Sequence, residues 1–269
     1  MAVDLVNDLR HDGFTVVPRA VPPERCGAVV DAIGAVCGVR LDDPETWDRI
    51  SARCDQVPVW NHPSQWAIRQ LPLLHEVWST IWGRDDLWSD LNSCRVTPPS
   101  GPGRADPLPI HFDVDPREPN EQWFPGIVAL TDAPARHGGF RCVPSLFRDP
   151  TRWPATWTDT PHGTEYRPPY EDDEVIEVPL QVGDLLIMDS HLPHGTVPNV
   201  AATPRAVFYV QLHPAGTEEE RRERLREQES GHCPAWWRWK PGHDGIDRYD
   251  LDDLGLTALG RRLLGVDRW

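Results

Sequence analysis

Two histidines and one aspartate are the residues of this chain best suited to hold a metal ion. His111 and Asp113 flank Phe112, and His194 follows 81 residues after Asp113. Because side chains alternate between the faces of a strand, residues i and i+2 project to one side and can bind one ion, while Phe112 would point into packing. Two histidines and a carboxylate are the ligands of non-haem Fe(II) sites that leave positions open for a co-substrate and O₂. The spacing predicts such a site, with a partner strand delivering the third ligand.

Arg205 is the candidate residue for binding an anionic co-substrate. It lies eleven residues beyond His194, and its planar guanidinium matches the two oxygens of a carboxylate. Both motifs also have a simpler interpretation, because a His-x-Asp pair occurs by chance on polar strands and arginines are common on surfaces. The combination of the two metal segments with Arg205 favours the functional interpretation.

Four segments carry a resemblance to a known family: residues 9–18, 138–144, 183–199 and 203–205. The third begins with Gly183-Asp184 and ends in His194-Gly195-Thr196-Val197-Pro198-Asn199, and the fourth supplies Arg205. Together they resemble the phytanoyl-CoA hydroxylase-like family of Fe(II)/2-oxoglutarate-dependent dioxygenases over residues 5–215.

The resemblance implies a fold, cofactors and an activity. The fold would be a double-stranded β-helix (a cupin-like jelly roll), mainly β with flanking helices. Fe(II) would be bound by His111, Asp113 and His194, and 2-oxoglutarate by Arg205 with Thr196. The reaction would be the O₂-dependent hydroxylation, or another oxidation, of a small organic metabolite or natural-product intermediate. Related halogenating enzymes have a small residue where Asp113 stands, so the carboxylate favours hydroxylation.

The chain departs from the family pattern in two places. The middle block continues as Pro144-Ser145-Leu146-Phe147, where the family usually has Pro-Gly-Ser-His. The family's early polar contact to the co-substrate has no assigned position, and Asn92 and Arg95 are the candidates. His191 lies three residues before His194, but His194 fits the His-Gly pattern and the spacing to Arg205, so we expect His194 to bind the metal.

Composition limits the classes of partner. The chain has 27 Lys and Arg against 42 Asp and Glu, a net charge of −15 that disfavours nucleic acids and anionic membranes. No apolar run reaches the roughly 18 residues of a membrane span. The first residues are acidic rather than basic, which is untypical of a signal peptide, so we expect a cytoplasmic protein. The six cysteines include no C-x-x-C pair and indicate no thiolate zinc site.

Periodicity and turn residues predict the elements. Helices are expected over residues 4–12, 21–36 and 65–82, and strands over 14–17, 108–113, 125–131, 140–143, 175–179, 184–188 and 205–212. Successive strands separated by Gly and Pro favour antiparallel sheets or a barrel. A charged helix opens at Thr217 with capping-box spacing to Glu220. We therefore expect a jelly-roll domain over residues 1–215 and a helical C-terminal extension over 216–269.

The 13 tryptophans leave two alternatives open. The loop of residues 149–174 is long enough to cover a site, so its Trp153 and Trp157 are candidate substrate contacts, together with Trp123, which follows the first ligand strand. The tryptophans of the helix expected over residues 65–82 are predicted to pack in the core. The Trp236–Trp239 cluster is typical of a sugar-stacking surface, so a non-catalytic carbohydrate-binding jelly roll is one alternative. The other is a cupin-like metal-dependent isomerase or hydrolase that uses the same three ligands without 2-oxoglutarate. Oligomeric state is not indicated.

Overall fold

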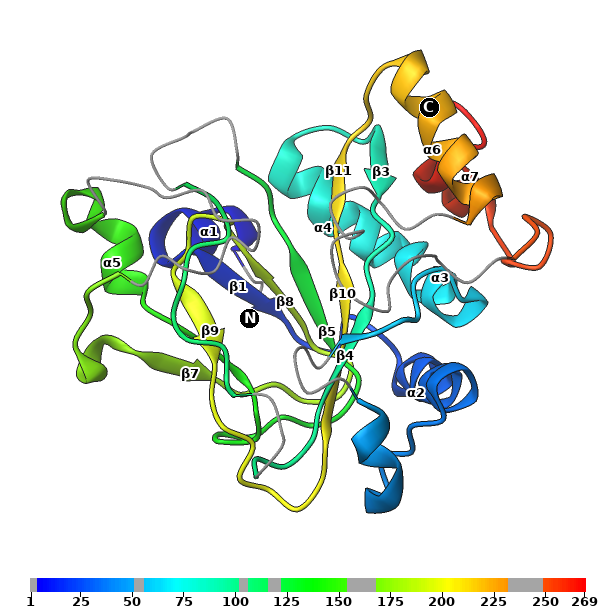
Figure 1. Cartoon of the computed structure of the whole chain (residues 1–269). Helices are drawn as coiled ribbons and strands as arrows, with labels where there is room; N and C mark the ends of the chain where they lie inside the picture. Colours follow the sequence, from blue (N-terminus) through cyan, green and yellow to red (C-terminus); the bar gives the residue numbers. More distant parts are fainter. Residues whose placement is uncertain (1–3, 51–55, 102–105, 116–121, 154–167, 232–248) are drawn as a thin grey trace.

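The computed structural model describes residues 4–50, 56–101, 106–115, 122–153, 168–231 and 249–269. Within this part the strands form sheets of six, three and two strands, and every pairing is antiparallel (Figure 1). Helices flank the sheets, as expected from the sequence. No helix among these residues has the length and apolar content needed to cross a membrane.

The strands of the large sheet come from distant parts of the sequence. Its order is β1-β8-β5-β10-β4-β2, formed by Phe14–Val17, Leu185–Met188, Gly126–Ala129, Arg205–Val210, Cys94–Thr97 and Gln56–Val57. The three-stranded sheet has the order β7-β6-β9, formed by Ile176–Val178, Phe140–Cys142 and His194–Thr196. The two-stranded sheet pairs β11, Leu212–Pro214, with β3, Leu87–Ser89.

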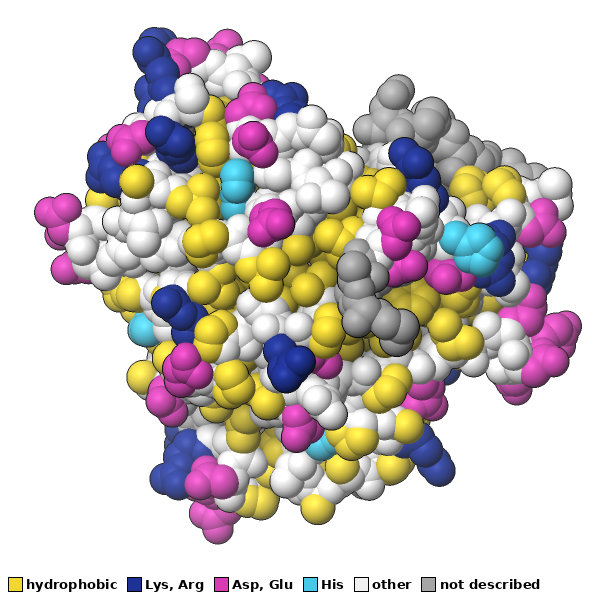
Figure 2. Space-filling view, turned by 180° about the vertical axis from the view of Figure 1, so that it is seen from behind, with side chains coloured by type: hydrophobic (Ala, Val, Ile, Leu, Met, Phe, Trp, Pro, Cys, Tyr) yellow, Lys and Arg dark blue, Asp and Glu magenta, His cyan; other side chains and the backbone are white. Residues whose placement is uncertain are grey.

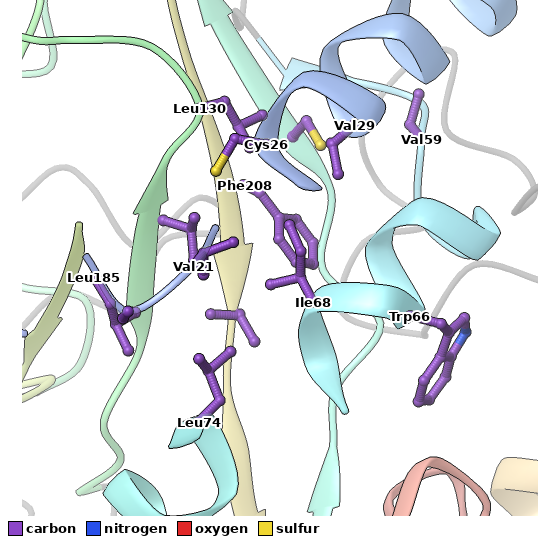
Figure 3. Packing of buried hydrophobic residues seen from close by; sticks show 14 of the residues in the cluster. Val21, Cys26, Val29, Val59, Trp66, Ile68, Leu74, Leu130, Leu185 and Phe208 are labelled. Atoms are coloured by element: carbon purple, nitrogen blue, oxygen red, sulfur yellow. The ribbon is translucent and has the colours of Figure 1, made fainter. Parts of the chain in front are cut away.

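One face of the large sheet is covered by helices. Residues 206, 208 and 210 of β10 belong to a core cluster that includes residues of α2 (Pro23–Cys37), α3 (Pro63–Arg69) and α4 (Pro72–Trp82). Figure 3 shows Phe208 on this face, close to Ile68 of α3 and Val29 of α2. Trp66 and Trp78 are fully buried in the same cluster. Trp82 is partly buried and packs against the cluster, so the tryptophans of these helices pack in the core, as the sequence predicted.

The other face of the large sheet packs against the three-stranded sheet. A second core cluster joins Val207 and Leu186 of the large sheet to Phe140 and Cys142 of β6. Alternation along β10 then places the side chains of residues 205, 207 and 209 between the two sheets. We call this side of the large sheet its inner face.

The helix expected over residues 65–82 is two helices. Helix α3 ends at Arg69, and α4 begins at Pro72 after Leu71 in an extended conformation, with φ −64° and ψ 129°. A proline has no N–H to continue a helix and disfavours a helical conformation in the residue before it. The prediction was therefore wrong about continuity, because Pro72 overrides the apolar periodicity around it.

The strand expected over residues 108–113 is largely irregular. Only His111 forms a bridge, antiparallel to His194 of β9. The remaining expected strands occur with ends shifted by one or two residues, and 205–212 is divided between β10 and β11. The other helical segments are α1 (Leu5–Asp12), η1 (Pro44–Arg49), α5 (Pro144–Arg148), η3 (Pro150–Arg152), η4 (Asp172–Glu174), α6 (Glu218–Ser230) and α7 (Ala258–Leu264).

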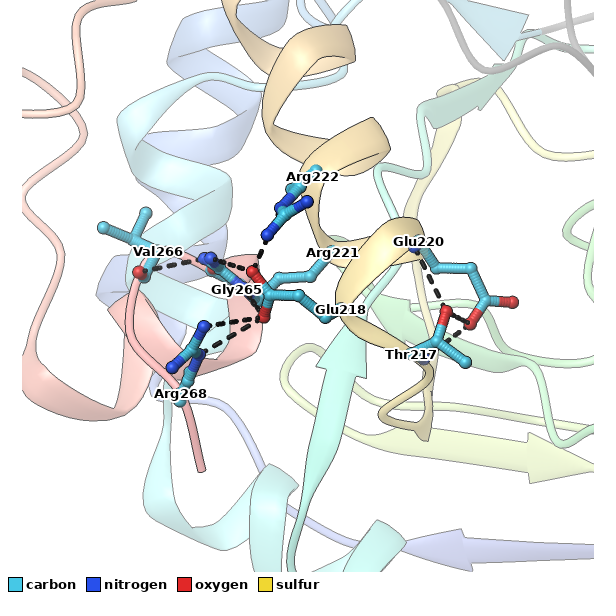
Figure 4. A network of polar contacts seen from close by, with 8 residues as sticks. All are labelled: Thr217, Glu218, Glu220, Arg221, Arg222, Gly265, Val266 and Arg268. Carbon is cyan, nitrogen blue, oxygen red and sulfur yellow. Dashed lines mark hydrogen bonds and ion pairs between the residues drawn. The ribbon is translucent and has the colours of Figure 1, made fainter.

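The described part of the C-terminal segment packs on the helical face. Leu254 and the α7 residues Leu263 and Leu264 belong to the same core cluster as α2 to α4. Helix α6 starts with the predicted capping box of Thr217 and Glu220, and Glu218 accepts hydrogen bonds from Arg221 and Arg268 (Figure 4). Division of the chain at residue 215 stays a prediction. The face in Figure 2 mixes acidic, basic and apolar side chains.

Candidate functional site

His111, Asp113 and His194 come together between the two sheets. One potential ligand atom of each lies within 4.8 Å of the others. His111 Nε2 is 3.5 Å from Asp113 Oδ1, and His194 Nε2 is 3.8 Å from Asp113 Oδ2. The imidazole rings are 4.6 Å apart between centroids. The i, i+2 spacing therefore predicted that His111 and Asp113 meet His194. A single β-bridge, rather than a regular strand, positions His111.

Backbone hydrogen bonds orient both imidazoles. His111 Nδ1 lies 2.8 Å from the Pro109 carbonyl oxygen, and His194 Nδ1 lies 2.9 Å from that of Leu192. Because a carbonyl only accepts, each Nδ1 must carry the proton, which leaves the lone pair on Nε2. Both Nε2 atoms face Asp113. This is the tautomer and orientation that a histidine needs to bind a metal.

Burial and the neighbouring carboxylate act on the protonation of the two histidines. Burial, reinforced by the nearby His111, lowers the pKa of His194 despite attraction by Asp113. Burial also acts to lower the pKa of His111, but the hydrogen bond and attraction from Asp113 outweigh it, so the net pKa is raised. The charge of Arg95 opposes that rise. A neutral His194 presents its Nε2 lone pair at neutral pH.

A glycine lets the two ligand segments approach. A Cβ atom on Gly195 would lie 2.5 Å from the Leu108 carbonyl oxygen and 2.6 Å from that of Pro109. The two segments exchange hydrogen bonds between the backbones of His111 and His194. Any larger residue after His194 would therefore push the segment that carries His111 away from β9.

Arg205 occupies the inner face as the first residue of β10. It is 2% exposed and lies opposite Thr97 of β4. Thr196 is on β9, two residues beyond His194, and so projects to the same side. Its hydroxyl accepts a hydrogen bond from the Leu108 N–H at 2.9 Å, which leaves its own proton available for a further acceptor.

His191 has a different environment from His194. Its Nδ1 lies 3.0 Å from Asp189 Oδ1, and its ring is parallel to that of Trp153, 6.3 Å away. His191 is not among the described residues that can share a metal ion, whereas His194 is. The structure therefore favours His194, as the sequence did.

The candidate substrate contacts lie in different places. Trp123 is 44% exposed, and its backbone exchanges hydrogen bonds with Ser190. The ring of Trp153 lies 6.1 Å from that of Phe112 between centroids, and its Nε1 donates to the Leu146 carbonyl. Trp157 and the Trp236–Trp239 cluster lie outside the described residues.

Strand β4 carries a row of polar residues that was not expected from the sequence. Val207 on the inner face is paired with Arg95, so Ser93, Arg95 and Thr97 all belong to that face. Arg95 is 6% exposed and Ser93 is fully buried. The alternation in Ser93-Cys94-Arg95-Val96-Thr97 is a strand signal, but such a pattern is more typical of a solvent-exposed polar face.

The donor set and its geometry fit iron. Two imidazoles and one carboxylate converge from one side, and the histidines' second nitrogens are held by carbonyls. The Asp113 side chain is 34% exposed, whereas those of His111 and His194 are 3% and 10% exposed. Asp113 is therefore the most solvent-accessible of the three ligands.

The fold of this chain is similar to those of several solved structures. The epimerase SnoN, crystallised with Fe³⁺, α-ketoglutarate and nogalamycin RO, has a TM-score of 0.61 and 16% identity, covering 92% of this chain and 95% of SnoN. EvdO2 from Micromonospora carbonacea var. aurantiaca, complexed with 2-oxoglutarate, has a TM-score of 0.56 and 16% identity over 80% and 92% of the two chains. GlcNAc Inducible Gene 2 from Candida albicans has a TM-score of 0.74 and 14% identity over 98% and 76%.

Sequence comparison identifies the family. No curated protein is significantly similar to the chain. The family model of phytanoyl-CoA dioxygenase (PhyH) matches residues 9–207, which include both histidines, Asp113 and Arg205. The predicted cofactors, iron and 2-oxoglutarate, are those of this family, and the metal-binding geometry of the triad agrees with them, so the prediction is confirmed. The chain belongs to the phytanoyl-CoA dioxygenase family.

Proposed function

We propose that this chain is an Fe(II)- and 2-oxoglutarate-dependent oxygenase that hydroxylates, or otherwise oxidises, a small organic metabolite or natural-product intermediate. The fold would be a double-stranded β-helix, whose two walls are the large sheet and the three-stranded sheet. Supporting this, side chains of both sheets share one core cluster and the triad lies between them.

We assign the metal to His111, Asp113 and His194. The observation that carries this assignment is the pair of Nδ1–carbonyl hydrogen bonds, which present both Nε2 lone pairs toward one carboxylate. Packing in the core alone would not require both histidines to direct their Nε2 atoms toward the same carboxylate. The ring of Phe140 stacks on His194 at 5.5 Å and supports it from the apolar core.

We assign the distal carboxylate of 2-oxoglutarate to Arg205 and Thr196. The chain leaves β8 at Met188, reaches His194 at the start of β9, and returns to β10 at Arg205. Thr196 and Arg205 each project from their sheet to the inner side. A co-substrate bound at the triad would extend along β9 toward Arg205, where a bidentate contact fixes its far end.

The residues around the triad would position the substrate and exclude water. Bound iron and 2-oxoglutarate supply O₂ activation and the oxidising power for attack on a C–H bond. Val207, Cys142 and Phe140 form an apolar lining that excludes water beside the histidines. Trp123 is the proposed apolar contact for substrate on the open side, and Trp153 and Trp157 remain proposed from the sequence.

The alternative of a metal-dependent isomerase or hydrolase needs no partner for a dicarboxylate. Arg205 is nonetheless buried on the inner face of the large sheet, the face that packs against the sheet carrying His194 and Thr196. This observation supports 2-oxoglutarate dependence over that alternative.

Anaerobic titration with Fe(II) and 2-oxoglutarate tests the assignment. We expect one Fe(II) per chain and the weak visible charge-transfer band of the chelate. His194→Ala should abolish the band, because a triad histidine is lost. His191→Ala is the matched control and should leave it largely intact, since His191 is held by Asp189. The reverse pattern would contradict the choice of histidine.

A further inference from the structure

One carboxylate ties together three short helical segments, α5, η3 and η4. Glu174 of η4 forms an ion pair with Arg152 of η3, in which two guanidinium nitrogens lie 2.6 and 2.8 Å from the two carboxylate oxygens. Ser145 of α5 donates its hydroxyl proton to Glu174 Oε1 at 2.8 Å, and the Glu171 N–H donates to Oε2 at 2.9 Å. These hydrogen bonds, that of Arg152 above all, hold the pKa of Glu174 below its usual range. We call Ser145, Arg152 and Glu174 the Glu174 network.

Each residue of the Glu174 network is followed in the sequence by a member of one apolar cluster. These members are Leu146, Trp153 and Val175, and the cluster also contains Ile110, Val143 and Tyr170. The Nε1 of Trp153 donates to the Leu146 carbonyl at 2.8 Å, which joins η3 to α5 a second time. The side chains of Arg152 and Glu174 are 34% and 20% exposed, whereas Leu146 is fully buried. The ion pair therefore lies at the margin of the cluster and holds its parts together.

The cluster lies against the segment that carries two of the triad residues. Ile110 is fully buried in the cluster and immediately precedes His111, and the ring of Phe112 lies 6.1 Å from that of Trp153 between centroids. The segment forms no regular strand, and within the described residues it is bridged to β9 only between His111 and His194. Apolar packing must therefore do more to fix this segment than it would in a regular strand.

Helix α5 also connects the cluster to the segment of His194. Val143, the N-cap residue of α5, donates its N–H to the Pro193 carbonyl at 3.0 Å, directly before His194. Cys142 is the register partner of His194 between β6 and β9. The Glu174 network is thus linked through the cluster to both segments of the triad, although none of its residues belongs to the triad.

We propose that the residues of the Glu174 network are positioning residues of the metal site. The inference rests on the proposed function, because it takes the triad as the ligand set of the iron. By joining α5, η3 and η4, the network holds the apolar cluster against Ile110, which fixes His111 and Asp113 relative to β9. Ser145 stands where the family pattern usually has glycine, which could not donate to Glu174. Loosening the network lets the ligand segment move away from β9 without removing any ligand.

The first experiment measures Fe(II) affinity by anaerobic titration of the full-length protein. We expect Arg152→Gln and Glu174→Gln each to raise the Kd of Fe(II) by about three- to tenfold, because each breaks the bidentate pair. Arg152→Lys should retain part of the affinity, since an ammonium keeps the charge but not the two parallel hydrogen bonds. Arg261→Gln is the matched control, because it breaks a bidentate pair with Asp267 at 2.8 and 3.0 Å beside α7. It should change the Kd by less than about twofold.

The second experiment measures the ligand segment itself, by amide hydrogen exchange and mass spectrometry of the metal-free protein. The backbone N–H groups of Leu108 and His111 both donate hydrogen bonds to β9, so their exchange reports separation of the two segments. We expect peptides over residues 108–113 to exchange about three- to tenfold faster in Arg152→Gln, while peptides over α7 keep their rate. Arg261→Gln should leave the exchange of residues 108–113 unchanged.

Two results would overturn the proposal. One is unchanged Fe(II) affinity, or unchanged exchange over residues 108–113, in folded Arg152→Gln and Glu174→Gln. The other is an equal loss of Fe(II) affinity in Arg261→Gln, which would make the effect one of general stability. If Arg152→Gln does not fold, Arg152→Lys and Ser145→Ala decide both points. Absence of Fe(II) binding in the unmodified protein would instead contradict the proposed function, while the exchange experiment would still decide whether the network positions the segment.

Discussion

At the scale of single residues, the orientation of the two triad histidines is set by the hydrogen bonds of their Nδ1 atoms. His111 and His194 present Nε2 because their Nδ1 protons are held by the Pro109 and Leu192 carbonyls. His191 has an equally buried ring, but Asp189 holds its Nδ1 and it takes no part in the triad. The convergence of Nε2 with Asp113, rather than burial, thus distinguishes the candidate ligand from its neighbour.

Arg205→Ala should weaken 2-oxoglutarate binding far more than Fe(II) binding. A charge-assisted contact is worth about 1.5–3 kcal/mol, or about ten- to more than a hundredfold in affinity. Arg205→Lys should recover only part, because an ammonium lacks the bidentate geometry. Anaerobic titrations of metal and co-substrate measure both effects, and thermal unfolding checks that the buried substitution leaves the fold intact. Equal losses of iron and 2-oxoglutarate would count against this role.

The triad and Arg205 could be predicted because metal ligands and a carboxylate partner need fixed residue types at fixed spacings. The row of Ser93, Arg95 and Thr97 could not be assigned in the same way. Alternating polar residues normally mark the solvent face of a strand, and only the register with Val207 shows that this face is the inner one. Arg95 appeared in the sequence only as one of two candidates for a co-substrate contact.

At the scale of elements, the site depends on close contact between β9 and the segment before His111. Thr196 and Leu108 exchange two hydrogen bonds there, and His111 and His194 exchange two more. Because Gly195 lies against the carbonyls of Leu108 and Pro109, the separation of the two segments is set by the missing side chain.

Gly195→Ala should therefore damage the metal site. The added Cβ meets two backbone oxygens that have no rotamer by which to move away, and such overpacking costs about 1–3 kcal/mol. We expect a lower Tm and weaker Fe(II) binding, measured by thermal unfolding and metal titration. Gly139→Ala is the matched control, since a Cβ there meets nothing within 4 Å. Unchanged iron affinity in Gly195→Ala would show that the close approach is not required.

The local sequence predicted helices and strands correctly where interactions between neighbouring residues determine them. The capping box at Thr217 and the strand at Phe14–Val17 occur as expected. The helix over 65–82 failed at Leu71, where Pro72 breaks the hydrogen-bond ladder. The strand over 108–113 failed because its pairing is decided by β9, which lies far away in the sequence.

At the scale of the whole molecule, one face of the large sheet forms the main hydrophobic core and the other carries residues of the candidate site. The helical face holds the larger core cluster, with Phe208 fully buried and the Arg69 guanidinium 4.9 Å above its ring. The inner face carries Arg95, Arg205 and the apolar lining of the site. Adjacent residues of β10 thus serve stability and ligand binding alternately.

Phe208→Ala should lower the free energy of unfolding by about 3–5 kcal/mol, because it leaves a cavity in the helical face. Iron and 2-oxoglutarate affinities of the folded fraction should stay within about threefold of the original, a change worth less than about 1 kcal/mol. Denaturant unfolding and anaerobic titration measure the two effects. Tyr209→Phe, on the inner face, should change stability by no more than about 0.5 kcal/mol. A large loss of iron binding in folded Phe208→Ala would show that the faces are not independent.

The most direct test of the central claim is a crystal structure of the protein grown anaerobically with Fe(II) and 2-oxoglutarate, with anomalous data collected at the iron edge. The account predicts one iron peak, bonded to His111 Nε2, His194 Nε2 and an Asp113 carboxylate oxygen, with 2-oxoglutarate extending from it to Arg205. An iron peak at other residues, or a co-substrate whose far carboxylate lies away from Arg205, would contradict it.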